Sequence, residues 1–220
     1  MGLLLAAGLA VGIAGVAWVS RLAVTRQPSH TVPAGELVAG RCFGQTFQAD
    51  FSGLHRIEVL LATYARENRG PVRLRVSETP EGEALATVEI DARSVKDNAF
   101  HAFAFPPIED AAGRRFFFCL EAPEATSGNA LTVWRADFDA YAGGQAIIDG
   151  EPVPGDLAFI LHYRAPASEV WSALKPSIRA YSPLLWRTRY LMAGVAGAWI
   201  MGVGWLLGWI LIPKSNGGRT

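Results

Sequence analysis

Catalytic sequence motifs are absent from this chain of 220 residues. The GxSxG, HExxH, P-loop, GxGxxG and EF-hand patterns, which place nucleophiles, metal ligands or phosphate-binding amides at fixed spacing, do not occur. Histidine is also scarce, and its four positions, 30, 55, 101 and 162, lie on unrelated segments. The sequence therefore predicts a protein that is not an enzyme.

A net charge is lacking as well, because 20 basic side chains balance 20 acidic ones. Nucleic-acid-binding surfaces need an excess of Lys and Arg, so no nucleic-acid partner is expected. Hydrophobic residues make up 50% of the chain, which is the composition of a folded protein rather than a disordered one.

Cysteine occurs only twice, as Cys42 and Cys119, and forms no CxxC pattern. This excludes a zinc ribbon, a thioredoxin-like redox motif and c-type haem attachment. Two interpretations stay open: a pair of small buried hydrophobic side chains, or a disulfide in an oxidising compartment. The sequence favours the first.

Two long uncharged runs stand at the ends of the chain. Residues 191–212 form a run of 22, which as a helix would span roughly 33 Å and so cross a bilayer. Residues 2–20 form a second run, which lacks the basic start and the cleavage site of a signal peptide. Both runs predict membrane-spanning helices.

Glycines recur at four-residue spacing within both runs. This spacing lets helix backbones approach closely, and it predicts helix packing, although lipid-facing glycines are the alternative. The residues concerned are Gly8, Gly12, Gly204 and Gly208.

Between the two runs the pattern changes to short stretches of alternating apolar and polar residues. Residues 72–76 alternate Val, Leu and Val with Arg, and turn residues such as those at 79–82 separate one stretch from the next. This period of two predicts an all-β sandwich. The expected organisation is a transmembrane helix at 1–21, a linker at 22–34, the sandwich at 35–165, a juxtamembrane helical segment at 166–187, a transmembrane helix at 188–213 and a tail at 214–220.

Aromatic and polar residues near strand ends are the candidates for ligand binding. A flat ring can stack on a sugar while amide and guanidinium groups bond its hydroxyls, so this set predicts a glycan site. The candidates are Tyr64, Asn68, Arg69, Asn129 and Tyr141.

Three aspartates are candidate metal ligands. Carboxylates suit a hard cation, so Asp137, Asp139 and Asp156 could hold a structural calcium ion. Their spacing alone is not diagnostic of a calcium site, and no other cofactor is expected.

Several stretches of the middle region, 44–47, 57–64, 68–71 and 115–118, are similar to a jelly-roll domain of uncharacterised bacterial membrane-anchored proteins. The resemblance implies an all-β jelly-roll-like sandwich flanked by N- and C-terminal transmembrane helices. It also implies a two-pass protein of the bacterial cytoplasmic membrane with the domain on the extracytoplasmic side. Likeness to carbohydrate-binding jelly rolls is a matter of shape alone.

The charge distribution disagrees with this sidedness. Arginines at 21, 26, 179, 187 and 189 flank the predicted spans on the domain side, against Lys214 and Arg219 on the other. The positive-inside rule would place the domain in the cytoplasm. We nevertheless take the extracytoplasmic side as the expectation, because the resemblance implies it.

Two functions remain as expectations. The first is a non-catalytic accessory or scaffold subunit in the lipid bilayer, which contacts other integral membrane proteins through its glycine-faced helices. The second is a glycan-binding module that serves cell-envelope polysaccharide assembly or recognition.

Overall fold

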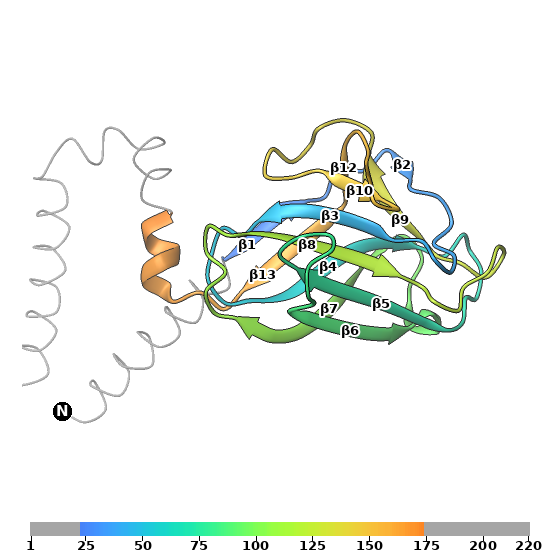
Figure 1. Ribbon diagram of the computed structural model, residues 1–220, viewed down its shortest axis with the longest axis horizontal. Helices are drawn as coiled ribbons and strands as arrows, with labels where there is room; N and C mark the ends of the chain where they lie inside the picture. Colours follow the sequence, from blue (N-terminus) through green and yellow to red (C-terminus); the bar gives the residue numbers. More distant parts are fainter. Residues whose placement is uncertain (1–22, 174–220) are drawn as a thin grey trace, which may run out of the picture. The chain divides into compact units, whose positions relative to one another are not determined.

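The computed structural model describes residues 23–173, which fold as two antiparallel β-sheets packed face to face (Figure 1). The β-sandwich predicted from the alternating pattern is thereby confirmed for this part of the chain. Within it, residues 72–76 lie in a strand whose Val and Leu side chains are buried and whose Arg side chains are half-buried.

The first sheet has the strand order β1-β13-β4-β9-β12, with β2 beside β9 and β7 beside β4. β13 pairs along one edge of β4 while β7 pairs along the other, so β4 is central. The strands of this sheet are β1 (Val24–Gln27), β2 (Val32–Pro33), β4 (Leu54–Ala62), β7 (Ala99–Ile108), β9 (Thr132–Ala136), β12 (Asp156–Leu157) and β13 (Phe159–Tyr163).

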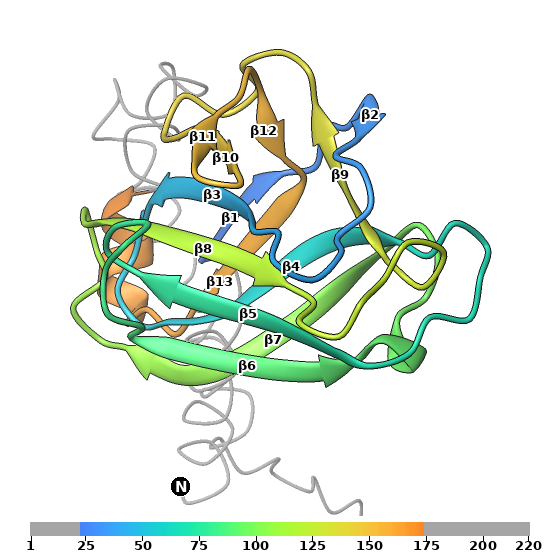
Figure 2. The same cartoon turned by 45° about the vertical axis from the view of Figure 1, so that its right-hand side comes forward.

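The second sheet has the order β11-β10-β3-β8-β5-β6. Figure 2 shows β3, β8, β5 and β6 side by side in one layer. The strands are β3 (Phe43–Gln48), β5 (Pro71–Ser77), β6 (Ala86–Asp91), β8 (Arg115–Glu121), β10 (Ala146–Ile148) and β11 (Glu151–Pro152), and the short 3-10 helix η1 (Ala92–Ser94) leads from β6 toward β7.

The segment predicted as a linker contributes strands to the first sheet. β1 pairs with β13 from Val24 opposite His162 to Gln27 opposite Phe159, and β2 pairs with β9. Gln27 is buried and its amide donates to the Leu157 carbonyl at 3.3 Å. The folded sandwich therefore begins before residue 35.

Phenylalanine side chains from both sheets fill the space between them. Phe47 of β3 lies 5.8 Å from Phe116 and 6.1 Å from Phe118, measured between ring centroids, and 6.4 Å from Phe159 of the opposite sheet. All four rings are buried. Burial of each ring stabilises the fold by about 2 kcal/mol through the apolar area removed from water.

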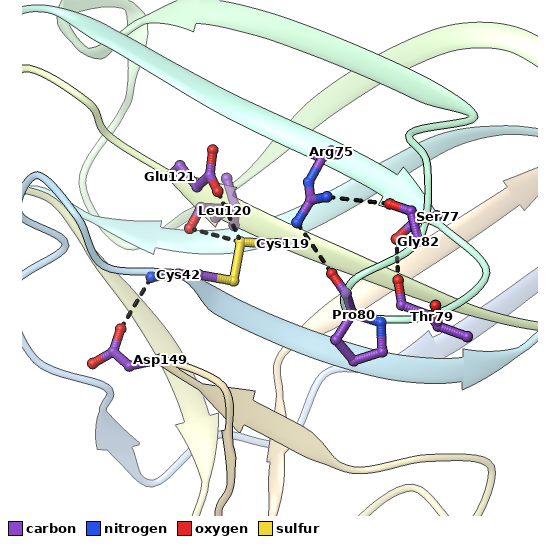
Figure 3. The surroundings of a disulfide bond; sticks show 10 residues. All are labelled: Cys42, Arg75, Ser77, Thr79, Pro80, Gly82, Cys119, Leu120, Glu121 and Asp149. Carbon is purple, nitrogen blue, oxygen red and sulfur yellow. Dashed lines mark hydrogen bonds between the residues drawn. A yellow bond between two sulfur atoms is a disulfide. The ribbon is translucent and has the colours of Figure 1, made fainter.

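A second buried cluster lies on the other face of β8, where Phe117 and Cys119 pack with Ile147. Phe117 covers Gly44, because a Cβ atom at that glycine would lie only 2.3 Å from the Phe117 ring. Cys119 forms a disulfide with Cys42, whose backbone N–H donates to Asp149 at 3.0 Å (Figure 3). The interpretation of two unbonded cysteines, which the sequence favours, is wrong.

A helix begins at residue 167 and is described as far as residue 173. Val170 on this helix is buried, and the Glu169 carboxylate accepts a hydrogen bond from the Ser52 backbone N–H at 2.8 Å. Trp171 is exposed. The first turn of this helix therefore packs on the sandwich.

The predicted fold class is wrong in its flanking transmembrane helices. Among residues 23–173 no helix is long and apolar enough to span a membrane; a span needs about 20 apolar residues, far more than the helix at 167–173 offers. The fold class is corrected to a β-sandwich with one short helix in the described part, and the predicted two-pass localisation loses its support. The predicted spans at 1–21 and 188–213 lie outside the described residues, as do Gly8, Gly12, Gly204 and Gly208.

Candidate functional site

Three loops meet at the end of the sandwich that lies on the right in Figure 1: residues 63–70, 92–98 and 122–131. The strand register places them together, because the last residues of β4 pair with the start of β7 and of β9, and the first residues of β5 pair with the ends of β6 and β8. We call this group of loops the distal end.

A tight turn in the first of these loops has an unusual backbone. Arg66 N–H donates to the Thr63 carbonyl at 3.2 Å, and the two residues between them, Tyr64 and Ala65, have φ angles of 57° and 56°. A turn with two left-handed central residues normally carries Asn and Gly, because a Cβ atom is crowded there. The chain thus keeps a tyrosine at a position that disfavours it.

Side chains from two directions hold this turn in place. Asp97 accepts from both the backbone N–H and the hydroxyl of Thr63, at 2.6 and 3.0 Å, and Asn68 donates to the Thr63 carbonyl at 3.1 Å. The bond from the Thr63 N–H holds the pKa of Asp97 below its ordinary value. Strained backbone maintained by such surrounding bonds is characteristic of functional sites.

A small cavity of about 290 Å³ opens beside the turn, lined by Arg66, Glu67, Asn68, Ala92, Arg93 and Val95. Asn68 is only 2% exposed, and while its NH2 group bonds to Thr63, its Oδ1 atom is buried without a hydrogen-bond partner. Nearly all buried polar atoms in proteins have a partner. A ligand donor that enters the cavity would supply the missing one.

Arg66 connects the cavity to the tyrosine. Its guanidinium carbon lies 4.8 Å from the centroid of the Tyr64 ring, within cation–π range. The same guanidinium bonds to Glu36 at 2.9 Å, and this bond is the main reason why the pKa of Glu36 lies below its ordinary value. The Tyr64 side chain is 41% exposed, so part of its ring is available for contact.

Arg69 and Asn129 lie on facing loops of the same end. The Arg69 N–H donates to Asn129 Oδ1 at 2.8 Å, and Asn129 Nδ2 donates back to the Arg69 carbonyl at 3.2 Å. The Asn129 amide therefore fastens two loops together. The exposed guanidinium of Arg69 has no partner among the described residues and can bind a ligand.

Tyr141 lies apart from the other four candidates, at the opposite end of β3. Its hydroxyl donates to the Gln48 carbonyl at 3.1 Å and accepts from the Gln48 N–H at 3.3 Å, and its ring stands edge-on to Phe159. Burial raises the pKa of the Tyr141 hydroxyl. This tyrosine fixes a loop against the sandwich.

The three aspartates do not come together as ligands. Asp156 is buried and accepts from the Gln45 amide and from the backbone N–H groups of Ala140 and Tyr141, at 2.9, 2.9 and 3.0 Å. Asp137 accepts from a threonine hydroxyl, and Asp139 is exposed. In residues 23–173 no group of three His, Cys, Asp or Glu side chains is placed to hold a metal.

Two residues of the distal end, Arg66 and Arg93, were not among the sequence candidates. Arg93 is on η1, and its backbone N–H donates to the side chain of the N-cap residue Asp91 at 2.9 Å. Asp91 directly precedes η1 and is a residue type that favours a helix start. The sequence does not show, however, that η1 lies beside the loop at 63–70.

Comparison with known proteins adds no relationship. No protein-family model matches the chain, and no curated protein matches it either. The resemblance to membrane-anchored jelly-roll proteins therefore stays a prediction.

Proposed function

We propose that the sandwich is a non-catalytic glycan-binding module whose site is the distal end. The observation that carries the proposal is the pairing of an exposed ring on a strained turn with a polar cavity. Tyr64 offers a face for a sugar ring, Asn68 offers an unpartnered acceptor for a hydroxyl, and Arg69 offers donors. The cavity, at about 290 Å³, is close to the lower limit of about 300 Å³ for ligand pockets.

The alternative role as a scaffold subunit rested on the predicted flanking helices. Those helices lie outside the described residues, whereas the loops of the distal end, which the structure describes, favour glycan binding. The Cys42–Cys119 disulfide supports an oxidising compartment as the place of action, since such bonds are rare where thiol reductants are abundant. Extracellular and envelope polysaccharides are accessible there.

Glycan binding is expected to depend on Tyr64. We predict that the purified full chain binds members of a bacterial and plant polysaccharide array, and that Y64N weakens the best binder about tenfold or more by removing the stacking ring. Asparagine tolerates the left-handed backbone, so this variant keeps the turn. Isothermal titration calorimetry measures the change.

The matched control is F138A, which removes another exposed aromatic side chain from a different loop. It should bind as tightly as the wild type. Absence of any binder on the array, or an equal loss in F138A and Y64N, would refute glycan binding at the distal end.

The strain in the turn predicts a stability change of unusual sign. Replacement A65G is expected to raise the free energy of unfolding by about 0.5–1 kcal/mol, because glycine adopts a φ of 56° without a Cβ penalty of about 1–2 kcal/mol and loses part of that gain to backbone entropy. Urea denaturation measures it. The control A102G, in the exposed middle of β7, should lower stability instead.

A further inference from the structure

A larger cavity, about 520 Å³ in volume, lies beside β1 and β13 at the opposite end of the sandwich from the loops of the distal end. Arg26, His55, His162 and Arg164 supply half of its described lining. The other described lining residues are apolar apart from Tyr163, and none of the described ones is acidic. The charged side chains among the described lining residues are therefore all basic.

Strand register and two irregularities bring these side chains to one place. His162 pairs with Val24 on one side and with Arg56 on the other. The register of β13 against β4 shifts between His162 and Tyr163, and that of β4 against β7 shifts across His55. Bulges of this kind redirect side chains, and here they place both imidazoles in the cavity.

The positive charges of the cavity are unbalanced. Neither Arg26 nor Arg164 forms an ion pair with any residue in the described part of the chain, and both are exposed. Glu58, whose carboxylate contacts His162 Nε2, is also in contact with the guanidinium of Arg56, which offsets its charge. Two unpaired guanidinium groups are left facing the space.

The surroundings of both imidazoles lower their pKa values. Burial first, and then the charges of Arg56, His55 and Arg26, lower the pKa of His162 to about 4. Burial and the charge of Arg164 lower the pKa of His55. The 3.2 Å contact between His162 Nε2 and Glu58 is therefore no ion pair at neutral pH, since the ring is uncharged.

Two ring nitrogens lack hydrogen-bond partners. His55 Nδ1 and His162 Nε2 are buried atoms for which the described residues provide neither donor nor acceptor in bonding geometry. Unpartnered buried nitrogens beside unpaired guanidinium groups are the arrangement that binds an oxyanion. We propose that this cavity binds a phosphate-type oxyanion, with Arg26 and Arg164 as its charged donors and the two imidazoles as its buried contacts.

The same chemistry suits a free phosphate ester and the phosphate of a lipid headgroup. Neither source depends on the glycan proposal, because the cavity and the distal end share no residue. If the glycan proposal fails, the oxyanion proposal is unaffected, and the reverse also holds.

Titration of the full chain with sodium sulfate tests the site, since sulfate keeps its charge between pH 5 and pH 7. A bound oxyanion favours the imidazolium form and thus raises the pKa of His162, so protons are taken up on binding. The affinity for sulfate is then expected to rise about tenfold from pH 7 to pH 5. The ring proton of His162, followed by NMR, should titrate at higher pH in sulfate than in chloride.

Variants separate a site from general charge attraction. R26Q and R164Q change exposed side chains and should each weaken sulfate binding about tenfold, while H162Q should remove most of the pH dependence. R115Q, which removes an exposed arginine on the second sheet, should bind like the wild type. An equal loss in R115Q, or no saturable binding at either pH, would overturn the proposal.

Two further probes distinguish the sources. Inorganic phosphate tests a soluble ligand, and co-sedimentation with phosphatidylglycerol vesicles, against phosphatidylcholine vesicles, tests a headgroup. If R164Q weakens the binding of inorganic phosphate or of phosphatidylglycerol vesicles, the site is supported, and the probe affected shows whether the phosphate comes from a soluble ligand or a lipid headgroup. If neither probe binds in an R164Q-sensitive manner, the cavity is not a phosphate site.

Discussion

Reduction of the disulfide between Cys42 and Cys119 is expected to lower the free energy of unfolding by about 4 kcal/mol. The bond closes a loop with a sequence separation of 77 residues, and the chain entropy that it removes from the unfolded state grows with loop length. It also connects the residue before β3 to the middle of β8. Guanidinium denaturation with and without dithiothreitol measures the effect.

The double variant C42A/C119A provides the control for this experiment. It should be destabilised by a similar amount, and reductant should change its stability no further. Thiol labelling of the unfolded, unreduced wild type should find no free cysteine. Labelling of both cysteines, or a wild type that ignores reductant, would contradict the bond.

The sequence predicts strands where side chains alternate regularly. β5, from Pro71 to Ser77, contains the predicted alternation at residues 72–76, with its Val and Leu side chains buried. β1 is missed because Val24–Gln27 is short and its partner β13 lies at the other end of the domain in sequence. Pairing between such distant segments leaves no local signal. The disulfide also leaves no local signal in the sequence. It forms because the pairing of β3 with β8 places Gly44 opposite Cys119 and so brings Cys42 close to it.

The candidate site is predictable in part. Tyr64, Asn68, Arg69 and Asn129 meet at the distal end because turn residues between strands gather where strands end. The left-handed backbone of Tyr64 leaves no mark in the sequence, since such turns are recognised by Asn and Gly.

Tyr141 and Asp156 were candidates for ligand or metal binding, but both hold a loop that folds back onto the sandwich. Residues 137–145 carry Tyr141 to the Gln48 backbone and bring two N–H groups to Asp156. From the sequence, polar and aromatic side chains in loops are expected to be exposed. Their burial is decided by backbone hydrogen bonds that only the folded chain provides.

Replacement of Asp156 by alanine is expected to lower the free energy of unfolding by about 3 kcal/mol. The carboxylate is 1% exposed and accepts bonds from the backbone N–H groups of Ala140 and Tyr141 as well as from Gln45. Loss of the acceptor leaves buried donors without a partner, and each such donor costs about 1–3 kcal/mol. Urea denaturation of D156A measures the change.

Controls on the same loop distinguish this structural role from a metal site. D137A and D139A change exposed carboxylates, and each should alter stability by less than about 0.5 kcal/mol. Calcium should not shift the thermal midpoint of the wild type, because Asp156 is engaged by three protein donors and is not free to coordinate an ion. If calcium stabilised the wild type but neither D137A nor D139A, these carboxylates would be ligands after all. A destabilised D156A beside unaffected controls would instead establish Asp156 as the residue that fastens the loop.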